Sequence, residues 1–487
     1  MSPRSNQKEY TKKLDSWINQ NKHAVRLISC IGRLMYDKGV ELVIFRNPLI
    51  DVSPSAILHF HDYAKNFVKL PINIKDTADL AEQLCKLNLI PAKIDIGKLA
   101  YEWISDREHL LSQKEFLKDK LEHYINVEDL PIGSPTDVVL YGFGRIGRLC
   151  AREIIKKTGK GQQLRLRAIV TKDSEDNQIQ KRADLLRMDS IHGQFSGVVK
   201  VNEGEKSLSI NGQIVHMIQS SDPASIDYTQ YGIHNALVID NTGAIRDRES
   251  LSAHLRASGV ANVLLTAPGI DIPNIVFGVN HESILPADES IWSAGSCTTN
   301  AIVPVIKVLD QKFGINKGHI QSVHAYTNDQ NLLDNVHKKT RRGRSAAINM
   351  VITETGVVKA LTKVMPSMKG KMTANAVRVP TPNGSLAIIS VDLKESITKE
   401  SINQIMMEAA LNGDLVEQIR YSMETELVSN DIRGNYCPSI YDSESTIISH
   451  DGKSAVLYVW YDNEFGYTQQ VLHLAKYITE VRRPVYF

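Results

Sequence analysis

One cysteine of this chain has neighbours that could support covalent chemistry. Cys297 stands in the sequence Gly-Ser-Cys-Thr-Thr-Asn of residues 295–300, directly before the apolar residues 301–309, which suit a helix. At a helix N-terminus, unpaired N–H groups and the helix dipole favour the thiolate, which is the nucleophilic form of cysteine. The pattern therefore predicts a covalent catalyst. Taken alone it also fits a packing role, because a cysteine beside an apolar helix is often simply buried.

A glycine-rich motif between two predicted strands indicates a nucleotide site. Strands are predicted over residues 137–141 and 164–170, and between them stand Gly142, Gly144 and Gly147, followed by a helical stretch to about residue 157. In this motif the first glycine allows a tight turn, the second lets the backbone approach a pyrophosphate, and the third lets helix and strand pack closely. The phosphates would lie at the helix N-terminus. The sequence therefore predicts a dinucleotide cofactor.

Two later strands end near threonines that could reach the same cofactor. Strands are predicted over residues 236–240 and 260–265, and Thr242 and Thr266 follow them. Ligands of an open parallel sheet bind beyond the carboxyl ends of its strands, so we expect both threonines to contact the cofactor. Threonine is also a common helix cap, and that role stays open for each.

Composition and charge exclude several classes of protein. The chain has 487 residues, which is long enough for two or three domains, and a net charge of only +2, which gives no global attraction to nucleic acid or membrane. Its five cysteines are scattered without CxxC pairs, as suits a reducing cytosol and not a zinc site or a disulfide framework. The N-terminus lacks an apolar secretory core. We expect a cytoplasmic protein with no metal, no membrane segment and no nucleic acid partner.

Residues 1–130 read as an all-α extension. Apolar residues recur there at helical spacing, and Ser53, Asp76 and Ser112 are predicted to cap three of the helices. A Pro/Gly/Ser linker over residues 131–135 closes the extension. We find no catalytic cluster in it, so we expect a module that packs on the rest of the protein or on a neighbouring subunit.

From about residue 136 to its end, the chain resembles the phosphorylating glyceraldehyde-3-phosphate dehydrogenases. The glycine and cysteine motifs carry the resemblance, and the interval of 27 residues from Cys297 to His324 also fits. Further motifs in family order are Asp-Ser-Ile-His-Gly at 189–193, Val-His-Ala-Tyr-Thr at 323–327, Thr-Gly at 355–356, Arg-Val-Pro at 378–380 and Asp-Asn-Glu-Phe-Gly-Tyr at 462–467. The resemblance implies an α/β Rossmann domain over 136–296, completed by a C-terminal helix over 466–487, and an α+β catalytic domain over 297–465.

The resemblance also implies an activity and the residues that perform it. The activity is the reversible oxidation of D-glyceraldehyde 3-phosphate with NAD(P)+ and inorganic phosphate to 1,3-bisphosphoglycerate, through a thioester on Cys297 and with His324 as base. Matching positions place the substrate phosphate at Thr327 and Arg378, and the attacking phosphate at Ser296, Thr298, Thr355 and Gly356. The matching cofactor contacts are the backbone of Arg145 and Ile146 for the pyrophosphate, and Asn463 for the nicotinamide amide.

Departures from the family pattern concern the choice of cofactor. NAD-preferring members carry an aspartate after the second strand, and this chain has Thr171 or Lys172 at that place. No carboxylate there would repel a 2′-phosphate, and the lysine could attract one. The Leu-Pro pair that usually precedes the basic loop is Asn335-Val336 here. We expect NAD or NADP as cofactor, with NADP accepted at least as readily as in ordinary members.

The basic loop of residues 337–344 lies at a subunit interface in the resembling family, which implies a homotetramer and leaves no need for nucleic acid. Two other interpretations stay open. One is an erythrose-4-phosphate dehydrogenase, which lacks the Thr-Gly pair found here at 355–356. The other is a non-catalytic regulatory paralogue whose extension binds a partner. The reversible reaction that the resemblance implies would serve glycolysis in one direction and gluconeogenesis in the other.

Overall fold

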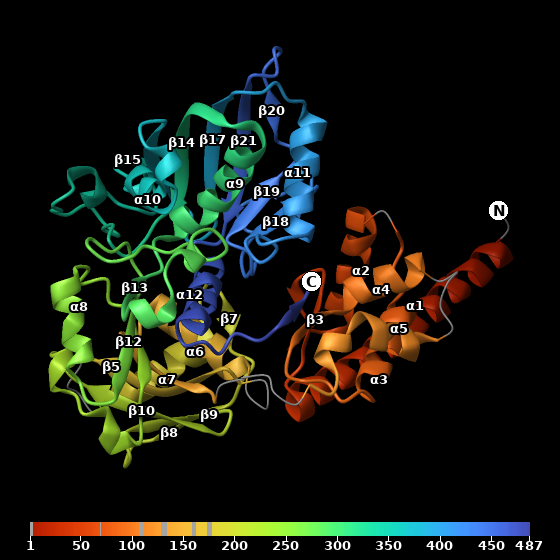
Figure 1. Ribbon diagram of the computed structural model, residues 1–487, viewed down its shortest axis with the longest axis horizontal. Helices are drawn as coiled ribbons and strands as arrows, with labels where there is room; N and C mark the ends of the chain where they lie inside the picture. The colour runs from red at the N-terminus through yellow and green to blue at the C-terminus, as the bar shows by residue number, and fades with distance from the viewer. Residues whose placement is uncertain (1–2, 69, 107–111, 128–133, 158–161, 173–177) are drawn as a thin grey trace. The chain divides into compact units, whose positions relative to one another are not determined.

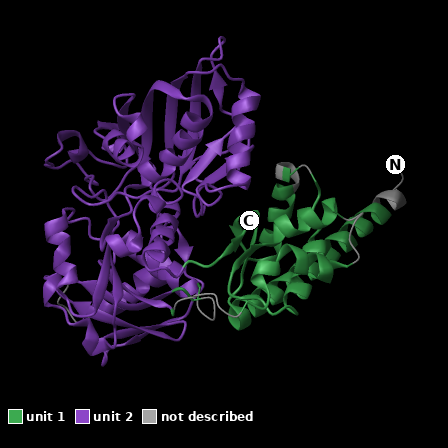
Figure 2. Cartoon of the chain, viewed as in Figure 1, with its two compact units in different colours: residues 1–134, 157–163, 482–487 green, residues 135–156, 164–481 purple. Residues whose placement is uncertain are grey.

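The chain divides into two compact units. The computed structural model describes residues 3–487 apart from residue 69 and residues 107–111, 128–133, 158–161 and 173–177. The first unit comprises residues 1–134, 157–163 and 482–487, and the second comprises residues 135–156 and 164–481 (Figure 2). Both ends of the chain therefore belong to the first unit.

Helices make up most of the first unit. They are α1 (Pro3–Arg33), a π-helix (Leu34–Lys38), α2 (Pro54–Val68), α3 (Ile74–Leu84), α4 (Ile96–Ser105) and α5 (Gln113–Lys120) (Figure 1). Ser112 caps α5 as predicted, since its hydroxyl accepts the Glu115 N–H at 3.3 Å. The predicted Asp76 cap is wrong. Asn73 caps α3 instead, and Asp76 lies in the first helical turn.

The expectation of an all-α extension needs a correction, because the first unit also contains a sheet. Its strands are β1 (Glu41–Ile44), β2 (Asn47–Pro48), β3 (Lys93–Asp95) and β22 (Val485–Tyr486), in the order β2-β1-β3-β22. β3 pairs in parallel with both β1 and β22. Strands of two to four residues leave little alternation in the sequence, and one of these comes from the far end of the chain.

Asp95 joins β3 to α4 and holds the β1–β2 turn. Its carboxylate is fully buried and accepts the backbone N–H groups of Phe45, Arg46, Gly97 and Lys98 at 2.9–3.0 Å. The Arg46 guanidinium donates to the same carboxylate at 2.8 Å. Phe45 and Arg46 adopt positive φ angles of 43° and 68°. A buried charge is tolerated only when it is paired and hydrogen-bonded, so this carboxylate fixes the local fold.

The last six residues are bound by the first unit. The Tyr124 hydroxyl donates to the Val485 carbonyl at 2.6 Å, and the Tyr486 hydroxyl donates to Glu102 at 2.5 Å. Arg483 donates to the Gly39 carbonyl at 2.8 Å. The predicted C-terminal helix over 466–487 is therefore too long. α12 (Phe465–Ile478) ends before Pro484, which cannot supply the N–H that a continuing helix needs.

The second unit contains two eight-stranded sheets. The first has the order β13-β12-β11-β4-β5-β10-β9-β8, and its central pairs from β13 to β10 are all parallel. These strands are β4 (Thr136–Tyr141), β5 (Leu164–Thr171), β8 (Val199–Asn202), β9 (Ser207–Ile210), β10 (Gln213–Gln219), β11 (Ala236–Asp240), β12 (Val260–Leu265) and β13 (Ile291–Ser293). This is the predicted Rossmann-type sheet.

The second sheet is mixed and has the order β15-β16-β14-β17-β21-β19-β18, with β20 paired to β21. Its strands are β14 (Ile315–Ala325), β15 (Val351–Thr353), β16 (Met372–Val379), β17 (Ser385–Leu393), β18 (Ile419–Ser422), β19 (Ser439–Asp442), β20 (Ile447–Ile448) and β21 (Ser454–Tyr461). α9 (Cys297–Phe313) packs on this sheet (Figure 1). α12 follows β21 but packs on α6 (Arg145–Lys156) of the first sheet, where Val471 and Leu474 join the core around Val138.

Candidate active site

The glycine motif has the backbone that a bound pyrophosphate requires. Gly142 has φ +91°, which only glycine adopts without strain. A Cβ on Gly147 would lie 2.5 Å from the Gly142 carbonyl oxygen, so only glycine fits that close approach. A Cβ on Gly144 would meet nothing within 4 Å, and that side of the loop is open. Since α6 begins at Arg145, with Ile146 next in its first turn, the open side lies at a helix N-terminus.

The other predicted cofactor residues lie on the same edge of the sheet. Tyr141, just before the glycine motif, pairs with Val170 of β5 and with Asp240 of β11, so the carboxyl ends of these strands are level. Thr171 ends β5, and the exposed Lys172 follows it. Thr242 follows β11 and Thr266 follows β12. The strand order reverses between β4 and β11, which is where such sheets bind their ligands.

Both threonines also make local hydrogen bonds. The Thr242 hydroxyl donates to the Asp240 carboxylate at 2.6 Å, and the Thr266 hydroxyl donates to the Asp240 carbonyl at 3.1 Å. Each oxygen keeps acceptor capacity. Neither threonine caps an α-helix, since Asp247 caps α8 (Arg248–Leu255) and Ser296 caps α9.

An ion cluster links the glycine motif to the start of α12. The Arg145 guanidinium binds Glu464 and Asp189, and the His192 imidazole lies 3.0 Å from Glu464. Burial acts to raise the pKa of Asp189, but the backbone N–H groups of His192 and Ile191, and the charge of Arg145, lower it to about 2. The sequence motifs at 189–193 and 462–467 thus meet in space, and the Arg145 side chain links them by binding Asp189 and Glu464.

Cys297 is the first residue of α9, as predicted. The Ser296 hydroxyl accepts the Thr299 N–H at 3.1 Å and so caps the helix. Cys297 is half-buried, and its Sγ lies 3.9 Å from the Thr298 hydroxyl. The Ser296 hydroxyl, in the residue before Cys297, is therefore already used as the helix cap.

His324 faces the cysteine sulfur from β14. Its Nε2 lies 3.4 Å from Sγ of Cys297. Its Nδ1 lies 2.7 Å from the Ala325 carbonyl oxygen, to which Arg378 also donates at 2.8 Å. In the tautomer whose Nδ1–H donates to this carbonyl, Nε2 has no proton and is directed at the sulfur. In the other tautomer Nδ1 accepts from Nη1 of Arg378, 2.8 Å away, and Nε2 carries the proton. The geometry of the first tautomer suits transfer of the thiol proton to His324.

Arg378 lies beside His324 because their strands pair. β14 and β16 run in parallel with His324 opposite Arg378, and Nη1 of Arg378 is 2.8 Å from Nδ1 of His324. Among the described residues, the buried Nε of Arg378 has no hydrogen-bond partner. A buried guanidinium with an unused donor is suited to an anion.

Burial opposes the ionisation of Cys297 that its place at a helix N-terminus predicts. Burial raises the pKa of the Cys297 thiol, and the positive Arg378 and the Thr298 hydroxyl offset only part of the effect. Burial, and after it the charge of Arg378, lower the pKa of His324 to about 3. With no anion beside Arg378, the thiol and the imidazole are therefore both favoured in their neutral forms.

Tyr461 is a site residue that sequence reasoning missed. Its buried hydroxyl lies 3.1 Å from the Thr298 hydroxyl and 2.9 Å from that of Ser322, and its ring meets His324 edge-on at 5.8 Å. It therefore holds the two catalytic elements, α9 and β14, together. Its position directly before the Asp-Asn-Glu motif could have indicated that it lies near the site.

Asn463 is tied to the same centre through one serine. The Ser385 hydroxyl donates to Oδ1 of Asn463 at 3.1 Å and accepts the Ala325 N–H at 3.1 Å. The predicted nicotinamide contact and the strand end that carries His324 are thus fixed relative to each other.

The remaining predicted phosphate residues lie on neighbouring elements. The Thr327 hydroxyl donates to Asp329, which pairs with Arg342. Thr355 and Gly356 precede α10 (Val357–Val364), which packs on α9. Backbone N–H groups at a helix N-terminus suit an anion. No hydrogen bond among the described residues joins this pair directly to Cys297 or His324.

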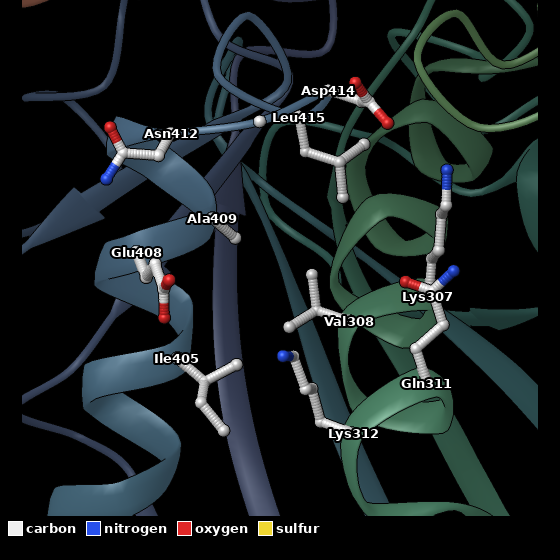
Figure 3. A pocket seen from close by; sticks show the side chains of 11 residues that line it. Lys307, Val308, Gln311, Lys312, Ile405, Glu408, Ala409, Asn412, Asp414 and Leu415 are labelled. Carbon is white, nitrogen blue, oxygen red and sulfur yellow. The ribbon is translucent and has the colours of Figure 1, made fainter.

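A separate cavity of about 360 Å³ lies between α9 and α11 (Lys399–Leu411) (Figure 3). Lys307, Val308 and Lys312 line it from α9, and Ile405 and Glu408 line it from α11. Lys307 is ten residues beyond the cysteine, which is about 15 Å along a helix. The cavity is therefore distinct from the cysteine site.

The described ranges contain neither a candidate membrane-spanning helix nor a candidate metal cluster. No helix there is both long and apolar enough to cross a bilayer. No cluster of three or more His, Cys, Asp or Glu side chains in the same ranges could hold a metal ion.

Family models match both parts of the second unit. Residues 136–248 match the NAD-binding domain of glyceraldehyde 3-phosphate dehydrogenase, and residues 296–463 match its C-terminal domain. The extension lies outside both matches.

Whole proteins match as well. The chain is 45% identical over 463 residues to a glyceraldehyde-3-phosphate dehydrogenase-like protein of Pseudomonas aeruginosa, covering 94% of this chain and all of the relative. It is 40% identical to the glyceraldehyde-3-phosphate dehydrogenase of Clostridium pasteurianum, over 72% of this chain and all of that protein. It is 39% identical to the chloroplastic glyceraldehyde-3-phosphate dehydrogenase A of Zea mays, over 72% of this chain and 86% of that protein. The chain is therefore an oxidoreductase of the glyceraldehyde-3-phosphate dehydrogenase family.

Proposed function

We propose that this chain is a phosphorylating glyceraldehyde-3-phosphate dehydrogenase, which converts D-glyceraldehyde 3-phosphate and inorganic phosphate to 1,3-bisphosphoglycerate. The observation that carries the proposal is the 3.4 Å approach of Cys297 Sγ to His324 Nε2. Arg378, with a donor to spare for an anion, supports a substrate that carries a phosphate. A thiol and an imidazole at this distance suit acyl transfer through a thioester.

In this reaction Cys297 acts as the nucleophile and His324 as the general base. Nε2 of His324 takes the thiol proton while Sγ of Cys297 bonds to the aldehyde carbon, and the proton passes to the carbonyl oxygen, which becomes a hydroxyl. Nicotinamide, when bound, supplies the hydride acceptor. His324 then takes the hydroxyl proton as the carbon is oxidised, which leaves a thioester on Cys297. Inorganic phosphate attacks the thioester carbonyl, and the sulfur leaves as thiolate and regains the proton from His324.

Substrate binding supports this chemistry electrostatically. Burial, and after it the charge of Arg378, lower the pKa of His324, which makes the imidazole a weak base. A phosphate dianion beside Arg378 offsets that positive charge. The pKa of His324 then rises toward neutrality, where a general base is most effective.

Cofactor binding is proposed at the glycine motif, with NADP accepted as well as NAD. The open backbone at Gly144 and the helix N-terminus at Arg145 suit a pyrophosphate, and Asn463 suits the nicotinamide amide. Thr171 and Lys172, at the end of β5, leave no aspartate to repel a 2′-phosphate. Lys172→Asp should therefore raise the ratio of NAD to NADP turnover. An unchanged ratio would count against the assignment.

We further propose that the chain forms a homotetramer and acts in the cytoplasm. The segment around the basic loop exposes several large apolar side chains, which a neighbouring subunit would cover: Leu332, Leu333, Val336, Ile348 and Met350, each more than 70% exposed. Light scattering of the purified chain measures the assembly directly. A monomer at micromolar concentration would contradict it.

The deciding experiment is phosphate-dependent turnover. Purified full-length chain should reduce NAD+ or NADP+ with D-glyceraldehyde 3-phosphate only when inorganic phosphate is present, and Cys297→Ser should abolish the signal. Faster turnover of erythrose 4-phosphate without a phosphate requirement would favour the erythrose-4-phosphate reading. Cofactor binding without turnover of either sugar would favour a regulatory protein.

A further inference from the structure

Two cysteines of the first unit meet in space although 55 residues separate them. Cys30 lies on α1, and Cys85 is the C-cap of α3, which packs on α1. Sγ of Cys85 is 3.9 Å from the Cys30 carbonyl oxygen, so the Cys85 thiol lies against Cys30. Both side chains are buried, with 4% and 7% of their surface exposed. The proposed dehydrogenase chemistry uses neither.

The surroundings make the two thiols unequal. The neighbouring Cys30 thiol, and after it the positive charges of Arg33 and Lys38, outweigh the effect of burial and lower the pKa of Cys85 to about 7. The same contact and burial raise the pKa of Cys30. Glu82 opposes ionisation of Cys85, but it is paired with Arg26 at 2.8 Å. An acidic thiol beside a second thiol is the arrangement of an attacking and a resolving cysteine.

We propose that Cys30 and Cys85 are a redox modification site, at which a hydroperoxide forms a reversible disulfide between α1 and α3. The thiolate of Cys85 attacks the peroxide and breaks its O–O bond, which gives a sulfenic acid and releases one molecule of alcohol or water. Sγ of Cys30 then bonds to Sγ of Cys85, loses its proton and expels the hydroxyl as water. The peroxide is reduced by two electrons, and the two thiols are oxidised by two. A dithiol reverses the bond by exchange.

Burial favours a small oxidant over a large one. With so little of either thiol exposed, hydrogen peroxide can reach the pair where a disulfide such as oxidised glutathione cannot. Cys150 is the other buried cysteine whose pKa is strongly shifted. Its thiol is fully buried, and burial raises its pKa, so it stays unreactive.

Peptide mapping tests the bond. The full-length Cys297→Ser chain, which removes the active-site thiol, has four cysteines left of five. Treatment of the folded protein with hydrogen peroxide, followed by denaturation and alkylation, should leave two free thiols. A non-reducing tryptic digest should show residues 27–33 joined to residues 76–86, and dithiothreitol should separate them. Four remaining thiols, or sulfinic acid on Cys85 without the cross-link, would overturn the proposal.

Single variants in the same background test the roles of the two sulfurs. Cys437→Ser is the matched control and should keep the cross-link. In Cys30→Ser, the stranded sulfenic acid on Cys85 should be trapped by dimedone, whereas Cys85→Ser should leave Cys30 unlabelled. Labelling of Cys30, or of neither residue, would refute the order of attack. The cross-link is measured in the Cys297→Ser chain, so that result does not depend on whether the further cysteine variants fold. None of these measurements depends on dehydrogenase activity.

Discussion

Replacing Arg378 by glutamine should raise the pKa of His324 by about 1 to 2 units. The guanidinium Nη1 lies 2.8 Å from Nδ1, and the pKa of His324 is about 3, with burial as the largest cause and Arg378 as the main charged contributor. Two unit charges about 4 Å apart interact by about 4 kcal/mol at an effective dielectric constant of about 20, which sets an upper limit of about 3 pKa units. Because burial is the larger cause and remains in the variant, the change should be smaller than that limit.

Histidine C2-hydrogen exchange, followed by mass spectrometry, reports this pKa residue by residue. In the parent chain His324 should stay neutral down to about pH 4.5, and in Arg378→Gln its midpoint should fall between about 4 and 5. Arg344→Gln is the matched control, because Arg344 is an exposed arginine paired with Asp334. A midpoint that moves by less than half a unit would show that Arg378 does not set the charge state of the imidazole.

Three further outcomes follow from the geometry. Gly147→Ala should lower the melting temperature, because its Cβ would lie 2.5 Å from a carbonyl oxygen. Gly144→Ala should keep the normal melting temperature but bind the cofactor more weakly, because its Cβ would project from the open side of the loop. Equal melting temperatures of the two variants would contradict this. The pKa of Asp189 is depressed to about 2, so its carboxylate contributes stability that is present above about pH 4 and lost as pH falls toward 2. Asp189→Asn should therefore lower the free energy of unfolding at pH 7 and flatten its fall in that range, as denaturant titrations at several pH values would measure. Deleting residues 482–487 should bring a calorimetric transition of the first unit to lower temperature, and an unchanged scan would refute the role of β22.

Local signals predicted the parts of the fold that depend on neighbours in sequence. The glycine motif predicted the turn into α6, and the small residues around Cys297 predicted the start of α9, because both are set by backbone rules that act within a few residues. Ser112 was found in the same way. Asp76 was not, since Asn73 and Asp76 are both good caps and only the packing of the helix decides between them.

Pairings between distant segments could not be predicted. β22 joins β3 across some four hundred residues, and neither strand is long enough to show alternation. The same applies to Tyr461, whose role depends on α9 and β14 meeting at its hydroxyl. The pKa of Cys297 was expected to fall on helix-terminus grounds and rises instead, because burial depends on the whole fold.

The union of β22 with β3 bears on how the protein is made. A ribosome adds about 5 to 20 residues per second, so the 390 residues between Asp95 and Val485 take roughly 20 to 80 seconds to appear. During that time β3 lacks its β22 neighbour, and that edge of the sheet is unpaired. The sheet of the first unit is thus completed only after the second unit has been synthesised.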